Sequence, residues 1–367
     1  MAGLYVHFPF CASRCIYCDF YARVGKDWRP YVEALLREIS ERKDFLEGVP
    51  PATLYFGGGT PSLLPAEALA RVADAVRSVF GVADFEEFTL EVNPDDVTPA
   101  SAEAWRTMGV SRVSVGVQSF CDEHLRWMHR RHTAAEAVAA VATLRAAGFD
   151  NLSLDLIFGF AGLSDSEWVA SIGQAVGLHP EHISCYQMMG RLADSDGEHC
   201  RRQYALLQER LAEAGYRQYE ISNFALPGRE SLHNSAYWDR RPYLGAGAGA
   251  HSFDGRRFRC WNMPDIDAYV QSRPGDGEHL SEREVYEEKL MLGLRTVRGL
   301  AFSALTERER AWLDEKKPVL EQLSRTGKLI VGPEGIRIPA DELFVSDGIV
   351  RELFPDQAQQ PLALQKA

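Results

Sequence analysis

The stretch that decides the fold is LYVHFPFCASRCIYC, which covers residues 4–18. Its first five residues alternate apolar and polar side chains, a pattern typical of a β-strand. Cys11, Cys15 and Cys18 follow this strand directly in a C-x3-C-x2-C arrangement. Thiolates are ligands for zinc, copper(I) and iron–sulfur clusters, and a tight loop lets three of them converge on one centre. The stretch therefore predicts a strand that leads into a three-cysteine metal site.

The surroundings of the three cysteines favour a four-iron, four-sulfur cluster over zinc. A structural zinc site needs a fourth ligand nearby, but Asp19 and Phe20 offer no usual one and His7 lies on the preceding strand. Three cysteines on a [4Fe-4S] cluster leave one iron open. That iron can bind the amino and carboxylate groups of S-adenosylmethionine (SAM), and reduction of the sulfonium then releases an adenosyl radical that abstracts hydrogen. Zinc remains the alternative.

Strand-like and helix-like runs alternate through the first two-thirds of the chain, which predicts repeated βα units. Thr133 and Glu136 form a capping-box pattern ahead of one helix, and Gly148 stands where a left-handed helix stop is expected. Right-handed βα units give a parallel sheet, either open or curled into a barrel. The predicted strands are Leu4–Phe8, Thr53–Gly57, Phe88–Asn93, Arg112–Gln118, Asn151–Phe158 and His182–Gln187.

The predicted strands share one phase, with apolar side chains on one face and polar side chains on the other. In the third strand, for example, Glu91 alternates with Leu90 and Val92. A closed eight-stranded barrel fills its interior mainly with branched apolar side chains, so a polar interior indicates a wider or incomplete barrel that holds water or ligand. An antiparallel sheet with one solvated face is the alternative, and the intervening helices disfavour it.

The alternation ends after Asn223. The predicted divisions are a barrel at 1–225, a Gly- and aromatic-rich connecting segment at 226–280, a small domain at 281–350 and a disordered tail at 351–367. In the small domain, Ser281 and Glu284 form a second capping box, a helix fits Pro318–Ser324, and two short strands flank a turn at Gly332–Gly335. Helices followed by a hairpin predict a winged-helix-like domain, but DNA binding does not follow from this pattern.

Composition and charge narrow the functional class. A formal net charge of -12 argues against a nucleic-acid binder, which would need accumulated Lys and Arg. The chain has no apolar run long enough to span a membrane, and its start has no pattern of a removable leader peptide. The chain has seven cysteines, an odd number, and no secretory signal, which argues against a set of disulfide bonds. Reduced or metal-bound thiols are therefore expected. We therefore expect a cytoplasmic protein.

The cysteine motif resembles that of the radical SAM enzymes, and nearly the whole chain resembles the group that contains oxygen-independent coproporphyrinogen III dehydrogenase and the HemW-type heme chaperones. The motifs that carry this resemblance are LYVHFP (4–9), GGGTPS (57–62), EVNP (91–94), GVQSF (116–120), DLIFG (155–159) and YEISNFA (219–225). The resemblance implies an α/β fold, a partial (β/α)6 radical SAM barrel. It also implies a cluster on Cys11, Cys15 and Cys18. The residues that it implies for SAM contact are Tyr5, Tyr17, Gly58, Gly59, Thr60, Glu91, Gln118, Arg130 and Asp155.

Several of these residues also have a physical reason to be at a site. Gly57–Gly59 end a strand, where missing side chains let the backbone approach a ligand. Glu91, Gln118 and Asp155 fall toward the carboxyl ends of successive strands, where parallel sheets gather their active sites. The alternatives are that Glu91 and Asp155 only satisfy hydrogen bonds in the core, and that Arg130 belongs to a solvated surface.

Two features favour the heme-chaperone branch over the dehydrogenases. The dehydrogenases carry another cysteine two residues beyond the third, where this chain has Phe20, and a longer segment before the motif. Residues 233–238, HNSAYW, match an element associated with the heme chaperones, which implies heme contacts by His233, Tyr237 and Trp238. A neutral imidazole can ligate heme iron, and aromatic rings can pack on the macrocycle. A capping or hydrogen-bonding role for His233 is the alternative.

The function predicted from these features is a heme chaperone that binds heme and passes it to an acceptor protein, with an electron donor, the cluster and SAM serving that cycle. The alternative is an enzyme of porphyrin metabolism that uses a 5'-deoxyadenosyl radical on coproporphyrinogen III. The segment after Gln187 is shorter than is usual in the family, so part of a substrate-facing loop is expected to be missing. The other cysteines, predicted as ordinary thiols, are Cys121, Cys185, Cys200 and Cys260.

Overall fold

The computed structural model describes residues 1–355, which belong to two compact units, one over 1–279 and one from Leu280 onward. Across residues 1–355, no helix combines the length and the apolar character that crossing a membrane would require. The unit boundary falls at the end of the segment 226–280, which the sequence set apart as a connection and which folds as part of the first unit.

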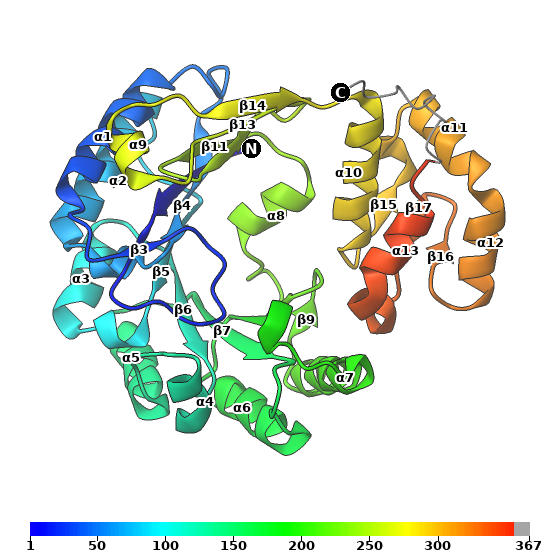
Figure 1. Cartoon of the computed structure of the whole chain (residues 1–367), viewed down its shortest axis with the longest axis horizontal. Helices are drawn as coiled ribbons and strands as arrows, with labels where there is room; N and C mark the ends of the chain where they lie inside the picture. Colours follow the sequence, from blue (N-terminus) through cyan, green and yellow to red (C-terminus); the bar gives the residue numbers. More distant parts are fainter. Residues whose placement is uncertain (356–367) are drawn as a thin grey trace, which may run out of the picture. The chain divides into compact units, whose positions relative to one another are not determined.

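The core of the first unit is a parallel sheet of six strands that pair in the order in which they follow along the chain (Figure 1). The strands are β1 (Ala2–Phe8), β4 (Pro51–Gly58), β5 (Glu87–Val92), β6 (Arg112–Gln118), β7 (Leu152–Phe158) and β8 (His182–Gln187). The connecting helices include α1 (Arg29–Glu41), α2 (Ala66–Phe80), α3 (Pro99–Thr107), α4 (Asp122–Trp127), α5 (Ala134–Ala146), α6 (Asp165–Gly177) and α7 (Gly197–Glu213). The predicted α/β class and its six βα units are confirmed.

Further strands extend both edges of this sheet. The β8 edge continues through β10 (Asn223–Ala225) and β9 (Arg217–Gln218). The β1 edge continues through β11 (Tyr243–Ala246), β12 (His251–Phe253), β13 (Phe258–Trp261) and β14 (Asp276–His279). Among the strands within residues 1–355, no pairing joins β14 to β9, so the sheet does not close on itself. The predicted incomplete barrel is therefore confirmed.

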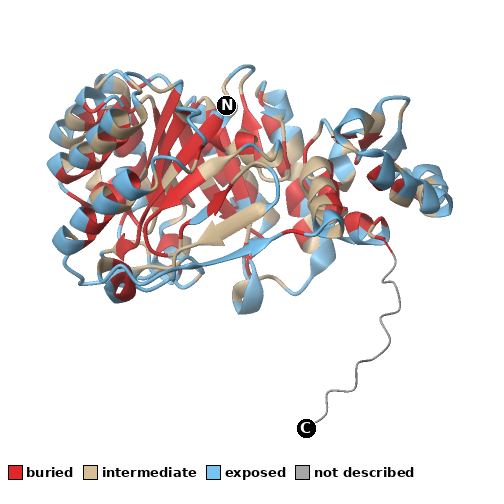
Figure 2. Cartoon of the chain, turned by 90° about the horizontal axis from the view of Figure 1, so that it is seen from above, coloured by how far each residue is buried: buried red, intermediate tan, exposed pale blue. Residues whose placement is uncertain are grey.

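The two faces of the strands differ as their sequence phase predicts. Apolar side chains such as Leu4 and Leu90 are fully buried, and Figure 2 shows buried strands beneath helices that expose their outer faces. The polar set is buried as well and is linked from strand to strand. Ser153 Oγ lies 2.7 Å from His182 Nδ1, and Ser114 Oγ donates to Asp155 Oδ1 over 3.2 Å. These links place the polar side chains on one shared face, because each buried polar group needs a partner.

Helix caps account for where several helices begin and end. Thr133 and Glu136 form a reciprocal capping box at α5, and Gly148 just beyond this helix has a φ of 89°. Ser281 and Glu284 form a second box at α10 (Glu282–Leu294). In each box, two backbone N–H groups that have no partner inside the helix gain one. Both predicted boxes and the predicted stop are confirmed.

The helix α8 (Leu232–Trp238) carries the HNSAYW element and packs against the amino-terminal parts of β1 and β4. The buried carboxylate of Glu87, at the start of β5, accepts hydrogen bonds from Ser231 Oγ (3.2 Å), Leu232 N (2.9 Å) and His233 N (3.0 Å). A carboxylate in this position satisfies free N–H groups and complements the helix dipole. Glu87 therefore holds α8 to the barrel.

The helices and strands of the second unit follow in the order helix, strand, helix, helix, strand, strand, helix. After α10 come β15 (Leu300–Ala301), α11 (Glu307–Glu315), α12 (Lys317–Arg325), β16 (Ile330–Val331), β17 (Gly335–Arg337) and α13 (Ser346–Glu352), and the sheet order is β15-β17-β16. The predicted C-terminal helices and the hairpin of β16 and β17 are present, and α11 is an element that the sequence analysis did not predict; the winged-helix-like character stays a prediction. The helix α13 includes the first two residues of the predicted tail 351–367, and residues 356–367 lie outside the described part.

Replacement of Glu87 by Ala should strongly destabilise the first unit. It removes the acceptor of three hydrogen bonds, two of them buried, and the acidic side chain that interacts most strongly with the fully buried guanidinium of Arg112. Loss of one member of a buried charged pair typically costs about 3–5 kcal/mol. Urea denaturation of the full chain measures this loss. The exposed neighbour Glu86 is the control, and Glu86→Ala should change stability by less than about 0.5 kcal/mol.

Candidate functional site

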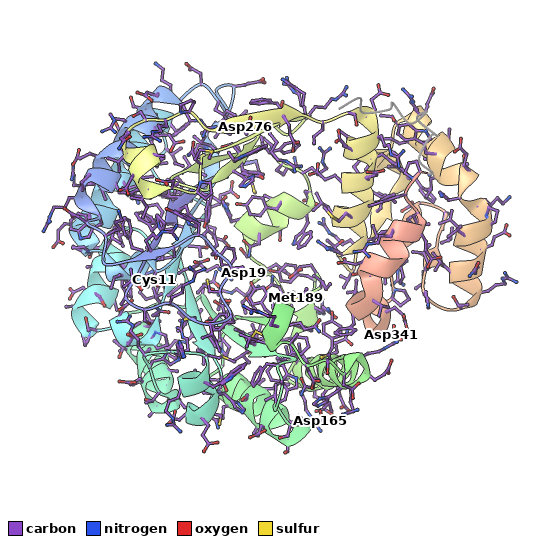
Figure 3. The ribbon with its side chains drawn as sticks, viewed as in Figure 1. Cys11, Asp19, Asp165, Met189, Asp276 and Asp341 are labelled. Carbon is purple, nitrogen blue, oxygen red and sulfur yellow. The ribbon has the colours of Figure 1, made fainter. Side chains whose placement is uncertain are left out.

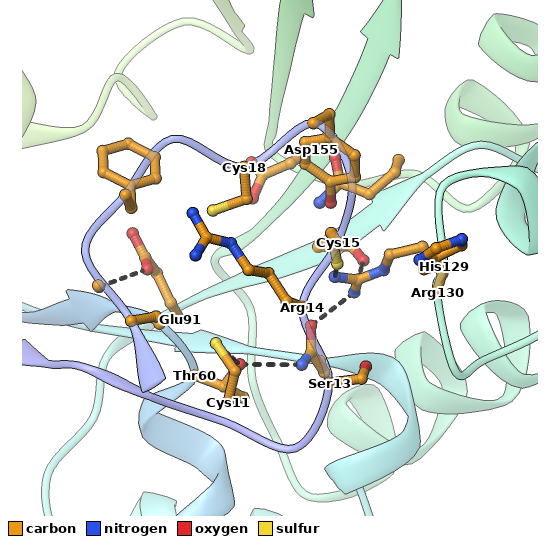
Figure 4. Close-up of a pocket in the computed structure, with 18 of the residues that line it drawn as sticks. Cys11, Ser13, Arg14, Cys15, Cys18, Thr60, Glu91, His129, Arg130 and Asp155 are labelled. Atoms are coloured by element: carbon orange, nitrogen blue, oxygen red, sulfur yellow. Dashed lines mark hydrogen bonds between the residues drawn. The ribbon is translucent and has the colours of Figure 1, made fainter. Parts of the chain in front are cut away.

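The three cysteines lie on one loop at the carboxyl end of the sheet. The loop starts at β2 (Phe10–Cys11) and ends at β3 (Arg23–Val24), which pair in parallel. Cys11, Cys15 and Cys18 are all half-buried free thiols, and they line the same cavity of about 550 Å³ (Figure 4). The cavity is also lined by Asp19 and Met189. Figure 3 labels both of them together with Cys11 in a wider view. The structure thus brings the predicted metal ligands to one space.

Neighbouring polar groups are directed at the cysteine sulfurs. Thr60 Oγ1 donates to Cys11 Sγ over 3.7 Å, and Arg130 Nη1 donates to Cys15 Sγ over 3.6 Å. Burial raises the pKa of the Cys11 and Cys18 thiols. Thiolates at such positions need a cation to offset the loss of water, because the charged form is the one that burial disfavours. A metal centre would supply that charge.

Two glycines let the second strand of the barrel approach the cysteine loop. A Cβ on Gly59 would lie 2.9 Å from Cys11 Sγ and 2.7 Å from Phe10 O, closer than side chains can approach. Gly58 has a φ of 116°, in a region that side chains rarely adopt. The glycine run therefore has steric and conformational reasons, as its place at the end of a strand predicted.

His7 connects the barrel to the cysteine loop. Tyr5 Oη donates to His7 Nδ1 (3.0 Å), and His7 Nε2 donates to the carbonyl oxygen of Tyr21, which lies on the loop (2.9 Å). Burial lowers the pKa of His7, which keeps the imidazole neutral and suits this pair of bonds. Both ring nitrogens are thus engaged, which further disfavours His7 as a fourth zinc ligand. Tyr5 itself does not line the cavity and is linked to the loop through His7.

A hydrogen-bonded network lines the floor of the cavity. Glu91 accepts from Tyr55 Oη (2.7 Å) and from the backbone N–H of Gly58 (3.1 Å). Arg130 Nη2 donates to Asn93 Oδ1 (2.5 Å) and to the carbonyl oxygen of Gly116 (2.7 Å). Arg130 is held inside this network, unlike the solvated surface residue that was the alternative. Asn93 and Tyr55 were not selected from the sequence, although Asn93 stands in the EVNP motif and Tyr55 shares the polar phase of its strand.

Burial strongly shifts the acidity of two cavity carboxyls. It raises the pKa of Glu91 to about 7 and that of Asp155 to about 6, and the repulsion between the two groups adds to the shift at Glu91. Such shifts concentrate at functional sites, where a carboxyl must change its charge state or meet a cationic ligand. Both groups are therefore suited to accept hydrogen bonds from a positively charged ligand.

The structure gathers most of the predicted SAM residues and separates the predicted heme residues from them. Besides the cysteines, the predicted residues that line the cavity are Tyr17, Gly58, Gly59, Thr60, Glu91, Gln118, Arg130 and Asp155. Gln118 has a φ of 68° at an irregularity in the pairing of β6 with β7. His233, Tyr237 and Trp238 lie on α8 and do not line the cavity.

His233 has the surroundings of a hydrogen-bonding histidine. Its side chain is buried, its Nδ1 lies 2.8 Å from Thr53 Oγ1, and its Nε2 lies 2.9 Å from Tyr237 Oη. Burial lowers the pKa of His233 to about 3, so the imidazole is neutral. Coordination of a heme iron by His233 would require one of these two bonds to break. Heme ligation by His233 stays a prediction.

Comparison with known proteins relates this geometry to a family. A model of the radical SAM superfamily matches residues 5–175, and a model of the HemN C-terminal domain matches residues 280–345. The chain is 35% identical to the heme chaperone HemW of Synechocystis over 88% of this chain and 84% of that protein. It is 36% identical to the heme chaperone HemW of Mycobacterium tuberculosis over 84% of this chain and 86% of that protein. The chain belongs to the HemW family of radical SAM proteins.

A solved structure supports the same fold. The coproporphyrinogen III oxidase HemN of Escherichia coli, described as a radical SAM enzyme, superposes with a TM-score of 0.82 over 96% of this chain and 90% of that one. Its sequence identity is 21%, so the likeness concerns the fold. Membership of the radical SAM superfamily implies a [4Fe-4S] cluster and SAM. The cavity fits both groups, because it combines three soft thiolates with buried carboxyls, a guanidinium and accessible glycine backbone.

Replacement of Gly59 by Ala should prevent normal cluster assembly while the sheet stays folded. The added methyl group would overlap Cys11 Sγ and the backbone of Phe10, so the cysteine loop must shift. Iron and acid-labile sulfide per chain after anaerobic reconstitution should fall severalfold. Gly173→Ala in α6 is the matched control, because its Cβ would meet no atom within 4 Å. Equal cluster content in the two variants would contradict the steric role of Gly59.

Replacement of Glu91 by Gln should change how stability depends on pH in the chain without cluster and SAM. The folded-state pKa of Glu91 is about 7, against 4.5 ordinarily, so the folded state binds the extra proton. Stability from this group is present below pH 4.5 and is lost as the pH rises toward 7, at about 1.4 kcal/mol per pKa unit. Urea denaturation between these pH values should give a flatter profile for Glu91→Gln than for the exposed control Glu86→Gln. Parallel profiles would contradict the raised pKa.

Proposed function

We propose that the protein is a heme chaperone that binds heme and transfers it to an acceptor protein in the cytoplasm. The observation that carries this proposal is the 33–36% identity to proteins named heme chaperone HemW over most of the chain. Phe20 supports it, because the dehydrogenases have a cysteine at that position. An electron donor would serve the cluster in this cycle.

The residues of the cavity have distinct parts in this proposal. Cys11, Cys15 and Cys18 would hold a [4Fe-4S] cluster, and an iron without a cysteine would be left for SAM. When bound, the cluster and SAM together supply reducing electrons and an adenosyl radical that abstracts hydrogen. Glu91 and Asp155 would accept hydrogen bonds from SAM, with Tyr17, Gly58, Gly59, Thr60, Gln118 and Arg130 completing its contacts. Tyr5 would act as a positioning residue through His7.

The outer part of the same cavity has the chemistry that a heme would need. Phe20 and Met189 both line it and are 70% and 72% exposed, which is unusual for large apolar side chains. Arg14 and Arg23 also line it and are exposed. Apolar side chains suit the face of a porphyrin, guanidinium groups pair with carboxylates such as its propionates, and a Met thioether can ligate heme iron. We therefore place the heme at this outer part, next to the cluster cysteines.

Substitution at this outer part should weaken heme binding. Phe20→Ser and Met189→Gln each remove apolar contact area, and we expect each to raise the Kd for heme about tenfold, which corresponds to about 1.4 kcal/mol. Absorbance titration of the anaerobically reconstituted full chain with heme measures the Kd. Met263→Gln is the matched control, because Met263 is 46% exposed but does not line the cavity, and its Kd should be unchanged.

Two further measurements separate the alternatives. If His233→Ala changed the heme spectrum while Phe20→Ser and Met189→Gln changed neither the spectrum nor the Kd, the heme would bind at α8 instead. If the chain consumed coproporphyrinogen III without binding heme stoichiometrically, the proposal would give way to an enzyme of porphyrin metabolism.

A further inference from the structure

We propose that Cys121, His124 and Glu167 form a zinc site that is separate from the cluster cysteines. One ligand atom from each of the three side chains lies within 4.8 Å of the other two. Cys121 stands between β6 and α4, His124 lies on α4, and Glu167 lies in the first turn of α6. None of the three lines the cavity that holds Cys11, Cys15 and Cys18. The three side chains therefore come from two separate βα units and meet only when the chain folds.

The imidazole of His124 is held so that one nitrogen points at the proposed ion. Its Nδ1 lies 3.3 Å from the hydroxyl of the buried Ser119, which also accepts from the backbone N–H of Cys121 (3.1 Å). Phe160 packs edge-on against the ring, with centroids 5.1 Å apart. Nε2 is then the nitrogen that faces Glu167. Metal-binding histidines usually have their second nitrogen hydrogen-bonded in this way, because the bond fixes the ring orientation.

Glu167 presents one free oxygen to the same point. Its Oε2 is used at the start of α6, where it accepts from Ser164 N (3.0 Å) and Ser164 Oγ (2.6 Å). Its Oε1 lies 3.7 Å from His124 Nε2, which is too long for a hydrogen bond. Zinc–nitrogen and zinc–oxygen bonds of about 2.0–2.2 Å in tetrahedral geometry place the two ligand atoms roughly 3.3–3.6 Å apart. The two atoms are therefore too far apart for a direct hydrogen bond and would need to approach by only a few tenths of an ångström to share one ion.

The ligand types select the class of metal. A thiolate and an imidazole favour zinc over magnesium or calcium, which prefer oxygen ligands. Three protein ligands leave a fourth position for water, and the site is open to solvent because the side chain of Glu167 is 45% exposed, against 13% for His124. The ion would join α4 to α6. The turn after α4 carries Arg130, and Met128 O in it accepts from Ile16 N of the cysteine loop (3.4 Å), so the ion would also brace this side of the cluster site.

The test is zinc binding by the full, cluster-loaded chain, measured by metal analysis after equilibrium dialysis and by X-ray absorption at the zinc edge. We expect one zinc per chain, with one sulfur at about 2.3 Å and nitrogen or oxygen ligands at about 2.0–2.2 Å. Cys121→Ser and His124→Ala should each weaken zinc binding by more than the roughly 10–100-fold that loss of an outer-shell partner costs. Cys260→Ser is the control and should bind zinc normally. Cys260 lies on β13, where its sulfur contacts Arg42, and it is not one of the three proposed ligands.

Three results would overturn the proposal: no zinc retained, retention that is unchanged in Cys121→Ser and His124→Ala, or a zinc with three sulfur ligands. The last result would assign the ion to Cys11, Cys15 and Cys18. The iron content of each variant is measured as a control for folding. If a variant loses zinc but keeps its iron, the loss of zinc is not due to unfolding of the barrel. The test does not depend on heme binding, so it stands whether or not the proposed chaperone function holds.

Discussion

The close approach of the second barrel strand to the cysteine loop is the constraint on which the site depends. Parallel pairing sets His7 beside Gly57 and Phe8 beside Gly58, so the glycine run arrives where the loop departs from β1. At the next position, Gly59, a Cβ would collide with the backbone of Phe10 and the sulfur of Cys11. The strand register and the absence of side chains at the glycines therefore together allow the loop to take the position in which the three thiolates converge.

The polar interior of the barrel follows from the same arrangement. Since the sheet does not close, its inner face is not filled by layers of branched apolar side chains, and hydrogen bonds between strands take their place. At the cysteine end these groups line the cavity. At the other end Glu87 and His233 bind α8 to the strands. One polar face thus serves as a ligand site at one end and as an attachment for a helix at the other.

Much of this could be predicted from the sequence because it depends on local patterns. Alternation along each strand gave the six parallel strands to within a few residues, and the capping boxes gave the starts of α5 and α10. The site residues at strand ends followed from the rule that parallel strands present their carboxyl ends together. The contacts that were missed join distant parts of the chain. Glu87 with α8, and Asn93 with Arg130, depend on the angle at which elements meet, which no local pattern contains.

The backbone hydrogen bonds around the cysteines are long: Cys18 N to Cys15 O within the loop and Ile16 N to Met128 O beyond α4 both measure 3.4 Å. The strands beneath it are largely buried, and each pairs with a neighbour on both sides. Order in the loop and order in the sheet thus have different sources, since metal–sulfur bonds would supply most of the first and hydrophobic burial the second. In thermodynamic terms, metal loading is linked to the folding of a short segment and not to that of the whole domain. Unlike in a zinc finger, we therefore expect the sheet to fold without metal and the metal centre to assemble on the folded framework.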